Sequence, residues 1–170
     1  MADGPDYTVP HRRRREQKTD YKERLDMLKS GKPRAVVRRS NSHARVQLVS
    51  YEQEGDDTIT SAFSKQLEEY GWEHHTGNLP AAYLTGYLAG TRALEEGIEE
   101  AVVDIGLQNH QHGTRIYAAV KGLIDAGLAV NADEDIFPPD RRIRGEHIDE
   151  YRDTDVAANF EEVKDKIGEA

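Results

Sequence analysis

Apolar and polar residues alternate along positions 43–51, the pattern of a strand with one face in the core. A strand is also expected over 34–39, followed by a turn at 40–42. A second turn over 55–57 then leads into a third strand over 58–63. Together these segments predict an antiparallel meander. Ala44, Val46 and Leu48 are expected to face the core, and His43, Arg45 and Gln47 to face outward.

The apolar pattern changes to a helical period after Asn78. Asn78 is a suitable N-cap, Pro80 falls in the first turn where its missing N–H costs nothing, and Gly97 follows the last periodic residue. The pattern therefore predicts a helix from Asn78 to about Glu96. Gly86 and Gly90 would let this helix lie close to the sheet.

A short apolar run over 101–106 indicates a buried strand, and residues 107–113 a loop. Thr114 is expected to cap a second helix that ends at Gly127. After a break at Pro138-Pro139, residues 141–152 suit a third, short helix, and the last residues a polar helical tail. The alternation of strands and helices favours a sheet covered by helices.

Residues 11–29 contain neither Gly nor Pro and suit one continuous helix, which Gly31 and Pro33 would end. On a helical wheel this segment has an apolar stripe, two basic flanks and an acidic back. The stripe is Tyr21, Leu25 and Leu28; the flanks are Arg14, Lys18 and Lys22 on one side and Arg13 and Arg24 on the other; the back is Glu16, Asp20, Glu23 and Asp26.

The predicted fold class is therefore α/β. It consists of an antiparallel strand meander plus a strand-helix-strand-helix layer, with a basic N-terminal helical arm and a short helical C-terminal extension. We expect three parts: the arm over residues 1–32, the α/β core over 33–130, and an acidic linker with the helical extension over 131–170.

Charge is divided unevenly along the chain. The 170 residues carry a formal charge of −9, yet residues 1–45 hold 13 Lys or Arg against 6 Asp or Glu. The rest of the chain holds 10 basic and 26 acidic residues, so a basic arm precedes an acidic body. Such a body suits very high salt, because molar salt screens charges beyond about 3 Å. There is no cysteine and no apolar stretch long enough to span a membrane, so we expect a soluble, cytoplasmic protein.

Two basic clusters are the main candidates for function, because Lys and Arg neutralise the phosphates of nucleic acids and release counterions. A solvated helix face or a targeting signal is the alternative for the first cluster. Asn41 and His43 near the second could supply base-edge hydrogen bonds and stacking, as looped RNA requires. The first cluster is Arg12, Arg13, Arg14, Arg15, Lys18, Lys22 and Arg24, and the second is Arg34, Arg38, Arg39 and Arg45.

Catalytic and metal-binding patterns are weak. His74 and His75 are adjacent and point apart on regular structure, while His110 and His112 have no neighbouring carboxylate or thiolate. Asp104 ends a buried strand, where α/β enzymes often place a catalytic carboxylate, but a turn anchor is the commoner role. No phosphate-binding glycine loop and no nucleophile elbow is present. We therefore expect no cofactor, no metal, no small-molecule substrate and no enzymatic activity.

Several motifs, in this order, resemble one family over about residues 7–151. That family is the universal 5S rRNA-binding large-subunit ribosomal protein, number eighteen in the bacterial naming, in its archaeal and eukaryotic branch. The acidic body is similar to versions from salt-loving archaea. The motifs include Arg12-Arg13-Arg14-Arg15-Glu16, Lys29-Ser30-Gly31-Lys32-Pro33-Arg34, Arg39-Ser40-Asn41-Ser42-His43, Pro80-Ala81-Ala82-Tyr83-Leu84-Thr85-Gly86, Ala101-Val102-Val103-Asp104-Ile105-Gly106-Leu107 and Arg144-Gly145-Glu146-His147.

The resemblance implies a layered α/β domain that docks on 5S rRNA in the central protuberance of the large ribosomal subunit. It also implies that the basic N-terminal segment touches 23S rRNA, and that neighbouring large-subunit proteins are partners. In the family the loop after Gly106 approaches 5S rRNA, but residues 108–112 depart from the family's usual forms here. The RNA contacts implied by the resemblance are Arg12 to Arg15, Lys18, Lys32, Arg34, Arg39, Asn41, His43 and Arg45.

Two other hypotheses belong to different classes. One is a metal-dependent RNA-processing hydrolase on a similar α/β sheet, which would use Asp104 with other carboxylates. The other is a protein–protein adaptor whose acidic body forms the interface. The hydrolase would degrade 5S rRNA in the presence of magnesium, and the adaptor would bind no RNA.

Overall fold

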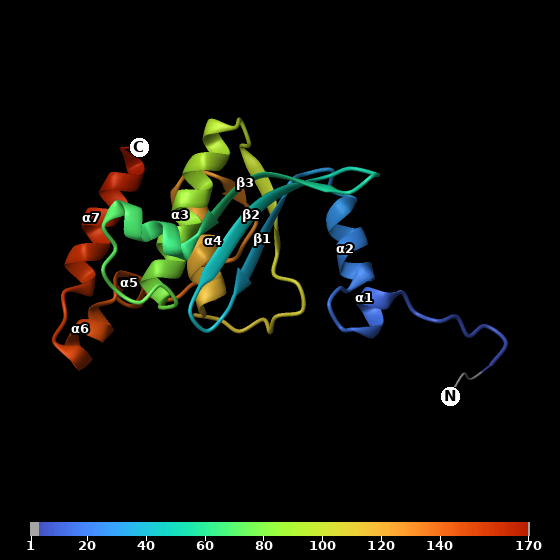
Figure 1. The fold of residues 1–170 in the computed structure, drawn as a ribbon, viewed down its shortest axis with the longest axis horizontal. Helices are drawn as coiled ribbons and strands as arrows, with labels where there is room; N and C mark the ends of the chain where they lie inside the picture. Colours follow the sequence, from blue (N-terminus) through green and yellow to red (C-terminus); the bar gives the residue numbers. More distant parts are fainter. Residues whose placement is uncertain (1–3, 170) are drawn as a thin grey trace.

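The computed structural model describes residues 4–169, which form an α/β fold around a mixed five-stranded sheet (Figure 1). The strand order is β3-β2-β1-β4-β5. β1 pairs antiparallel with β2 and parallel with β4, β2 and β3 are antiparallel, and β4 and β5 are parallel. The strands are β1 (Arg34–Arg39), β2 (Ala44–Tyr51), β3 (Asp56–Phe63), β4 (Glu100–Asp104) and β5 (Ala129–Val130).

The meander predicted from the sequence is confirmed. Ala44, Val46 and Leu48 of β2 are buried, because alternate residues of the strand point to the helix-covered face. One turn was misjudged: Asp56 and Asp57 belong to β3, so the reversal is confined to the residues before them. This difference matters below, because Asp56 becomes part of the sheet.

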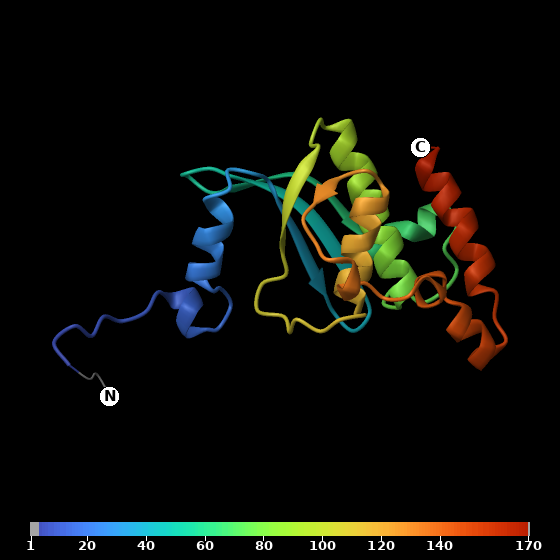
Figure 2. The same cartoon turned by 180° about the vertical axis from the view of Figure 1, so that it is seen from behind.

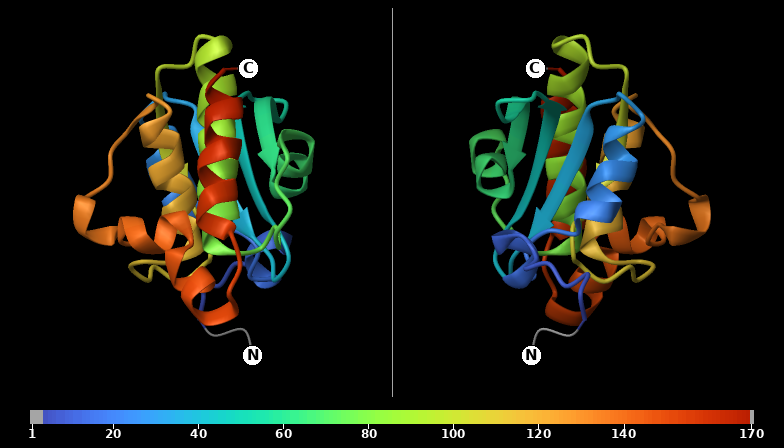
Figure 3. Two further views of the ribbon diagram at one scale, coloured as in Figure 1. Left: turned by 90° about the vertical axis from the view of Figure 1, so that its left-hand side faces the viewer. Right: turned by 90° about the vertical axis from the view of Figure 1, so that its right-hand side faces the viewer.

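Three long helices lie on one side of the sheet: α3 (Leu79–Glu95), α4 (Arg115–Asp125) and α7 (Val156–Gly168). Two 3₁₀ segments, η1 (Ser64–Tyr70) and η2 (Glu134–Ile136), lie in the connections. Figure 3 shows α7 stacked on α3, so that the layers run from the sheet through α3 and α4 to α7. Within residues 4–169, no helix is both long and apolar enough to cross a membrane.

Both predicted caps of α3 are present. The Asn78 side chain accepts a 2.8 Å hydrogen bond from the Ala81 amide, and Gly97 follows the helix with a positive φ of 76°. Thr114 occupies the N-cap position of α4, as predicted, but its hydroxyl does not bond the first amides of the helix. Local sequence signals therefore placed both helices correctly.

Gly86 and Gly90 permit a close approach, but the partner is α4 rather than the sheet. A Cβ added at Gly86 would lie 1.9 Å from the Ala119 carbonyl oxygen, and one at Gly90 would lie 2.6 Å from the Ala126 Cβ. From the other helix, a Cβ at Gly122 would lie 2.2 Å from the Tyr83 carbonyl oxygen. The sequence expectation was wrong about the partner, because the small residues face the second helix of the same layer.

The C-terminal part differs from the expectation in two ways. The predicted helix over 141–152 is two helices, α5 (Asp140–Arg144) and α6 (Glu146–Arg152), separated by Gly145 with a φ of 89°. The expected polar tail is α7, and one of its faces is apolar and buried in the core. That buried face consists of Val156, Phe160, Val163 and Ile167.

The N-terminal arm is also divided, into α1 (Arg12–Arg15) and α2 (Tyr21–Leu28). Gln17 has a left-handed φ of 51°, and the amides of Gln17 and Lys18 bond back to the carbonyls of Arg14 and Arg13, which ends α1. The Asp20 carboxylate then accepts hydrogen bonds from the Lys22 and Glu23 amides and starts α2. The single helix predicted over 11–29 was therefore wrong.

Candidate nucleic-acid interface

The face of the sheet turned away from α3 and α4 carries most of the predicted cations of β1 and β2. Figures 1 and 2, seen from opposite sides, show α1 and α2 on this side of the sheet. Arg34 and Arg38 alternate with the buried Ala35 and Val37, so both arginines lie on this open face. The sheet and the arm thus form one region from segments that are far apart in the sequence: the arm, the meander and the end of β4.

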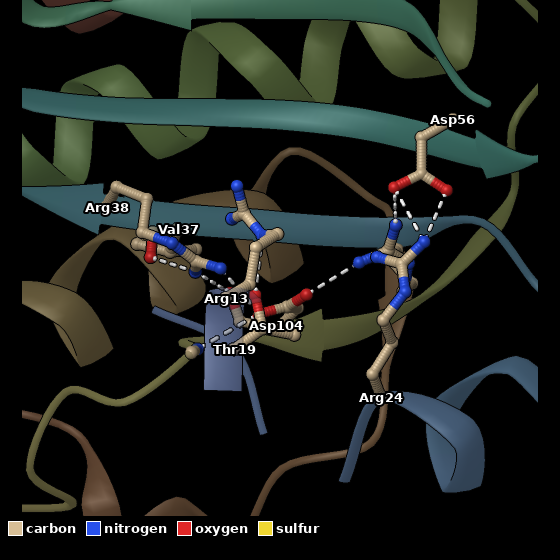
Figure 4. A network of polar contacts seen from close by, with 9 residues as sticks. Arg13, Thr19, Arg24, Val37, Arg38, Asp56 and Asp104 are labelled. Atoms are coloured by element: carbon tan, nitrogen blue, oxygen red, sulfur yellow. Dashed lines mark hydrogen bonds and ion pairs between the residues drawn. The ribbon is translucent and has the colours of Figure 1, made fainter. Parts of the chain in front are cut away.

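A chain of alternating charges joins α2 to the sheet (Figure 4). Arg24 of α2 lies 2.7 Å from the Asp56 carboxylate at the start of β3, and Arg34 lies 2.6 Å from the same carboxylate. Arg34 also donates a 2.7 Å hydrogen bond to Asp104. Arg38 donates to the other carboxylate oxygen and to the main-chain oxygen of Asp104, at 2.7 and 2.6 Å. The order Arg24–Asp56–Arg34–Asp104–Arg38 therefore links α2 to residues of β3, β1 and β4 and passes over β2.

The two carboxylates of this network stay ionised to unusually low pH. Burial alone would raise the pKa of Asp104, but the hydrogen bonds and charges of Arg38 and Arg34 outweigh it and hold the pKa below its usual value. Asp56 behaves in the same way, with Arg24 and Arg34 lowering its pKa against the effect of burial. Asp104 also accepts a 2.9 Å hydrogen bond from the Gly106 amide, so it anchors the turn after β4.

This arrangement separates the predicted RNA contacts into cations engaged in the network and cations that stay partly exposed. Arg34 is only 3% exposed, and Arg24 and Arg34 use their guanidinium groups in the network. Arg38 keeps a partly exposed side chain beside its contacts to Asp104. Lys32 lies 2.6 Å from the Glu100 carboxylate, and both of these side chains remain partly exposed.

The arm carries its cations on the surface. Arg12 to Arg15 and Lys22 are exposed, and Arg14 and Arg15 pair with no described carboxylate. The Arg13 guanidinium donates a 2.9 Å hydrogen bond to the Thr19 hydroxyl, and the Lys18 ammonium lies 2.9 Å from Glu16. Between the arm and the sheet lies a cavity of about 300 Å³, which Arg13, Lys18 and Arg38 help to line.

The expected three-sided helix does not exist, because the break at Gln17 separates its two ends. Leu25, expected in a docking stripe, is 56% exposed. Asp20 and Glu23 are exposed as expected, but Asp20 caps α2 rather than lying on the back of one long helix, and Glu23 lines the cavity beside Arg24. The arm is held by ion pairs more than by apolar packing.

The turn between β1 and β2 presents Arg39 and Asn41 to solvent. His43 is less accessible than predicted: its Nδ1 lies 3.0 Å from the Thr76 hydroxyl and its ring packs on Phe63 at 4.8 Å between centroids. The Arg45 guanidinium lies over the same Phe63 ring, 5.2 Å from its centroid. Phe63 was missed because the periodicity of β3 alone does not show which cations lie beside it.

Two further arginines near this turn were also missed. Arg115, at the start of α4, donates a 3.3 Å hydrogen bond to the Asn41 carbonyl and another to the Gly77 carbonyl. Arg142 of α5 lines the same pocket as Arg39 and Arg115. No local motif links residues 39, 115 and 142, so only the folded chain reveals that they converge.

The structure gives Asp104 a structural role. Its carboxylate oxygens are occupied by Arg34, Arg38 and the Gly106 amide, so the groups that a metal would need are already bonded. Residues 4–169 contain no group of three or more His, Cys, Asp or Glu side chains placed to hold a metal ion. The carboxylate that the hydrolase hypothesis requires is thus held by two arginines and a main-chain amide.

Comparison with known proteins gives one consistent family. The family model described as "Ribosomal large subunit proteins 60S L5, and 50S L18" matches residues 6–99. A large ribosomal subunit protein uL18 from Natronomonas pharaonis is 50% identical, over 98% of this chain and 98% of that protein. Proteins of the same name from Haloarcula marismortui and Halobacterium salinarum are 57% and 50% identical, covering 89% and 99% of this chain and 81% and 100% of their own lengths.

Proposed function

Because the chain belongs to the family of ribosomal large subunit proteins 60S L5 and 50S L18, we propose that it binds 5S rRNA and anchors that RNA to 23S rRNA in the central protuberance. Its role in the large subunit is structural rather than catalytic, and ribosomal RNA and other ribosomal proteins are its partners. The finer assignment to 5S and 23S rRNA rests on the resemblance of the arm and turn motifs.

One observation about charge supports the proposal most directly. In a chain with a net charge of −9, exposed cations gather on the arm and on the open face of the sheet. Arg14 and Arg15 of the arm, with Arg39 and Arg45 of the meander, can reach phosphates without first breaking an ion pair to a described residue. Their number and exposure fit phosphate neutralisation.

The buried cations take a supporting role in this proposal. Arg34 and Arg24 fix the position of α2 over the sheet, so that the arm presents its cations in a set direction. The exposed side of Arg38 extends the surface from the arm toward the turn. Lys18, Lys22 and Lys32 flank this path, and each keeps an exposed ammonium group.

The turn supplies the part of the surface that reads RNA structure. Asn41 is exposed at its tip and can bond base edges. His43 and Arg45 both pack on Phe63, which holds the Arg45 guanidinium in one plane suited to stacking or to phosphate. The Nδ1 of His43 is engaged with Thr76, so His43 serves through its ring rather than through that nitrogen.

Arg14→Gln with Arg15→Gln tests the arm. We expect the double variant to bind 5S rRNA more weakly, because two exposed phosphate contacts are removed. The slope of log K against log salt should become shallower by up to about 1.4 to 1.8, or roughly 0.7 to 0.9 per contact. Affinity is measured by titration in potassium chloride against 5S rRNA and against a scrambled RNA of equal length.

Arg152→Gln with Lys166→Gln is the matched control, since both residues are exposed on α6 and α7, across the sheet from the arm. This control should keep the slope of the unmodified protein. An unmodified protein that bound 5S rRNA no better than scrambled RNA would contradict the proposed function. Cleavage of the RNA in the presence of magnesium would instead favour the hydrolase hypothesis.

A further inference from the structure

A second basic site lies at the end of the sheet where β1 runs into its turn. It is a pocket of about 490 Å³ between the N-termini of α3 and α4 and the segment of α5 and α6. Arg39, Arg115 and Arg142 line it, together with His112 and His147. In Figure 1 the β1–β2 turn, the loop before α4 and α5 all lie toward the lower edge, the edge that α1 also approaches.

The charge of this pocket is not balanced by the protein. Among the described residues its lining includes no Asp or Glu, although the chain as a whole is strongly acidic. Neither Arg39 nor Arg142 forms an ion pair with a described carboxylate. Burial, and then the positive charge of Arg39, lower the pKa of Arg115 from its usual value. Three guanidinium groups gathered without an anion repel one another, and a bound anion would relieve that repulsion.

The main chain around the pocket adds to the same preference. Both α3 and α4 begin there, so the positive ends of two helices of 17 and 11 residues lie at the same region. The Thr114 hydroxyl and the His147 Nδ1 are buried at its lining and have no hydrogen-bond partner in the described part of the chain. These orphaned groups fit a site completed by a polar ligand.

We propose that this pocket binds a backbone phosphate of RNA, with Arg39 and Arg142 as its direct ligands and Arg115 as a positioning residue. Arg115 bonds the carbonyls of Asn41 and Gly77, so it fixes the turn while contributing charge. Through Arg115 the pocket adjoins the turn that carries the exposed Asn41, so the phosphate site lies beside the part of the turn proposed to contact RNA. This inference rests on the proposed function and extends the interface to residues of α4 and α5.

Arg39→Gln and Arg142→Gln, separately, test the pocket in the full-length protein. Each should weaken 5S rRNA binding by about tenfold, the effect of losing one charge-assisted hydrogen bond. Each should also make the salt slope shallower by roughly 0.7 to 0.9. Arg141→Gln is the matched control, because Arg141 is the neighbour of Arg142 on α5 but pairs with Glu150 outside the pocket. It should leave affinity and slope unchanged.

A second measurement locates the phosphate itself. Single methylphosphonate substitutions, which remove one phosphate charge, are introduced along 5S rRNA. We expect one position at which the unmodified protein loses affinity while the Arg142→Gln variant does not. If the Thr114 hydroxyl contacts the same phosphate, the methylphosphonate at that position should cost the Thr114→Val variant less affinity than it costs the unmodified protein. Thermal melting checks that every variant is folded.

The possible outcomes separate this inference from the proposed function. Failure of the unmodified protein to bind 5S rRNA would contradict the proposed function. Normal 5S rRNA binding by both arginine variants, with unchanged slopes, would overturn the pocket alone. A second result would also overturn the proposal of an RNA phosphate in the pocket. Inorganic phosphate at constant ionic strength would raise the melting temperature of the unmodified protein alone, while all variants bound RNA equally well. The pocket would then hold a free anion.

Discussion

At the scale of single residues, Arg34 shows how one cation can serve the fold rather than the ligand. It lies among the basic residues of β1, but the structure surrounds it with Asp56 and Asp104. Arg39 and Arg45, in the same pair of strands, are exposed and form no ion pair with a described carboxylate. The difference arises from Asp56 and Asp104, which are distant from Arg34 in the sequence but whose carboxylates reach it in the folded sheet.

Asp104→Asn tests this network. Asp104 is 6% exposed and neutralises Arg34 and Arg38, so the substitution leaves two cations facing each other across a buried amide. We expect the free energy of unfolding at neutral pH to fall by about 3 to 5 kcal/mol, the usual cost of removing one partner of a buried ion pair. Urea denaturation in concentrated potassium chloride measures the loss.

The loss of stability caused by Asp104→Asn should depend on pH. Because the folded pKa of Asp104 is lowered, its stabilising effect is present above the unfolded value of about 3.9 and is lost as pH falls through the folded value. The difference between the two proteins should therefore shrink in acid below about pH 4. Asp26→Asn is the control: Asp26 is exposed and pairs with Lys29, so little change is expected. A constant difference down to pH 2 would contradict this account.

At the scale of elements, the contact between α3 and α4 is set by three glycines. The helices approach closely because Gly86, Gly90 and Gly122 replace side chains at their crossing. This contact sets how the two helices lie against each other, and both of their first turns line the pocket that contains Arg39, Arg115 and Arg142. Helix packing inside the covered layer thus positions the residues of the proposed phosphate pocket.

Gly86→Ala tests this dependence. Its Cβ would lie 1.9 Å from the Ala119 carbonyl oxygen, which is main chain and cannot move alone. We expect a loss of stability of at least about 1 to 3 kcal/mol, the usual cost of overpacking. Gly55→Ala is the control, because its Cβ would meet open space and its φ is not in the left-handed region. Equal thermal melting temperatures for both variants would contradict the close approach.

The division of the arm into two helices also arises at this scale, and its signal was present in the sequence. Asp20 is followed three residues later by Glu23, the spacing typical of a helix start. The absence of Gly and Pro over 11–29 outweighed that signal in the prediction. Gln17 then takes a left-handed conformation that its residue type does not announce.

At the scale of the whole molecule, the separation of charge predicts opposite effects of salt on folding and on binding. Residues 46–170 carry 26 acidic and 10 basic side chains, and their mutual repulsion destabilises the compact state until salt screens it. Phosphate contacts weaken as salt rises. Residues 1–45, with their excess of cations, should therefore bind RNA best at the lowest salt at which the body is folded.

We expect the melting temperature to rise with potassium chloride up to molar concentration, while the affinity of the folded protein for 5S rRNA falls. Circular dichroism and RNA titration over the same series measure the two trends. Sucrose of equal osmolality is the control, because it favours compact states without screening charge. A fold that stayed intact at low salt, with melting independent of potassium chloride, would contradict the salt-adapted reading.

The sequence by itself determined the features that depend on neighbouring residues. Alternation of apolar and polar residues located β2, Asn78 and Gly97 bounded α3, and the segregation of charge placed the candidate interface in the first 45 residues. These features could be predicted because strand periodicity, helix caps and net charge are local properties of the chain.

Only the tertiary structure decided which cations remain available. Asp56 and Asp104 engage Arg24, Arg34 and Arg38, while Arg39 meets Arg115 and Arg142 in a pocket with no carboxylate among the described residues. The burial of α7 and the contact of Gly86 with α4 likewise depend on partners far away in the sequence. The physical reason is the same in each case: exposure and ion pairing are set by which distant segments the fold brings within a few ångströms.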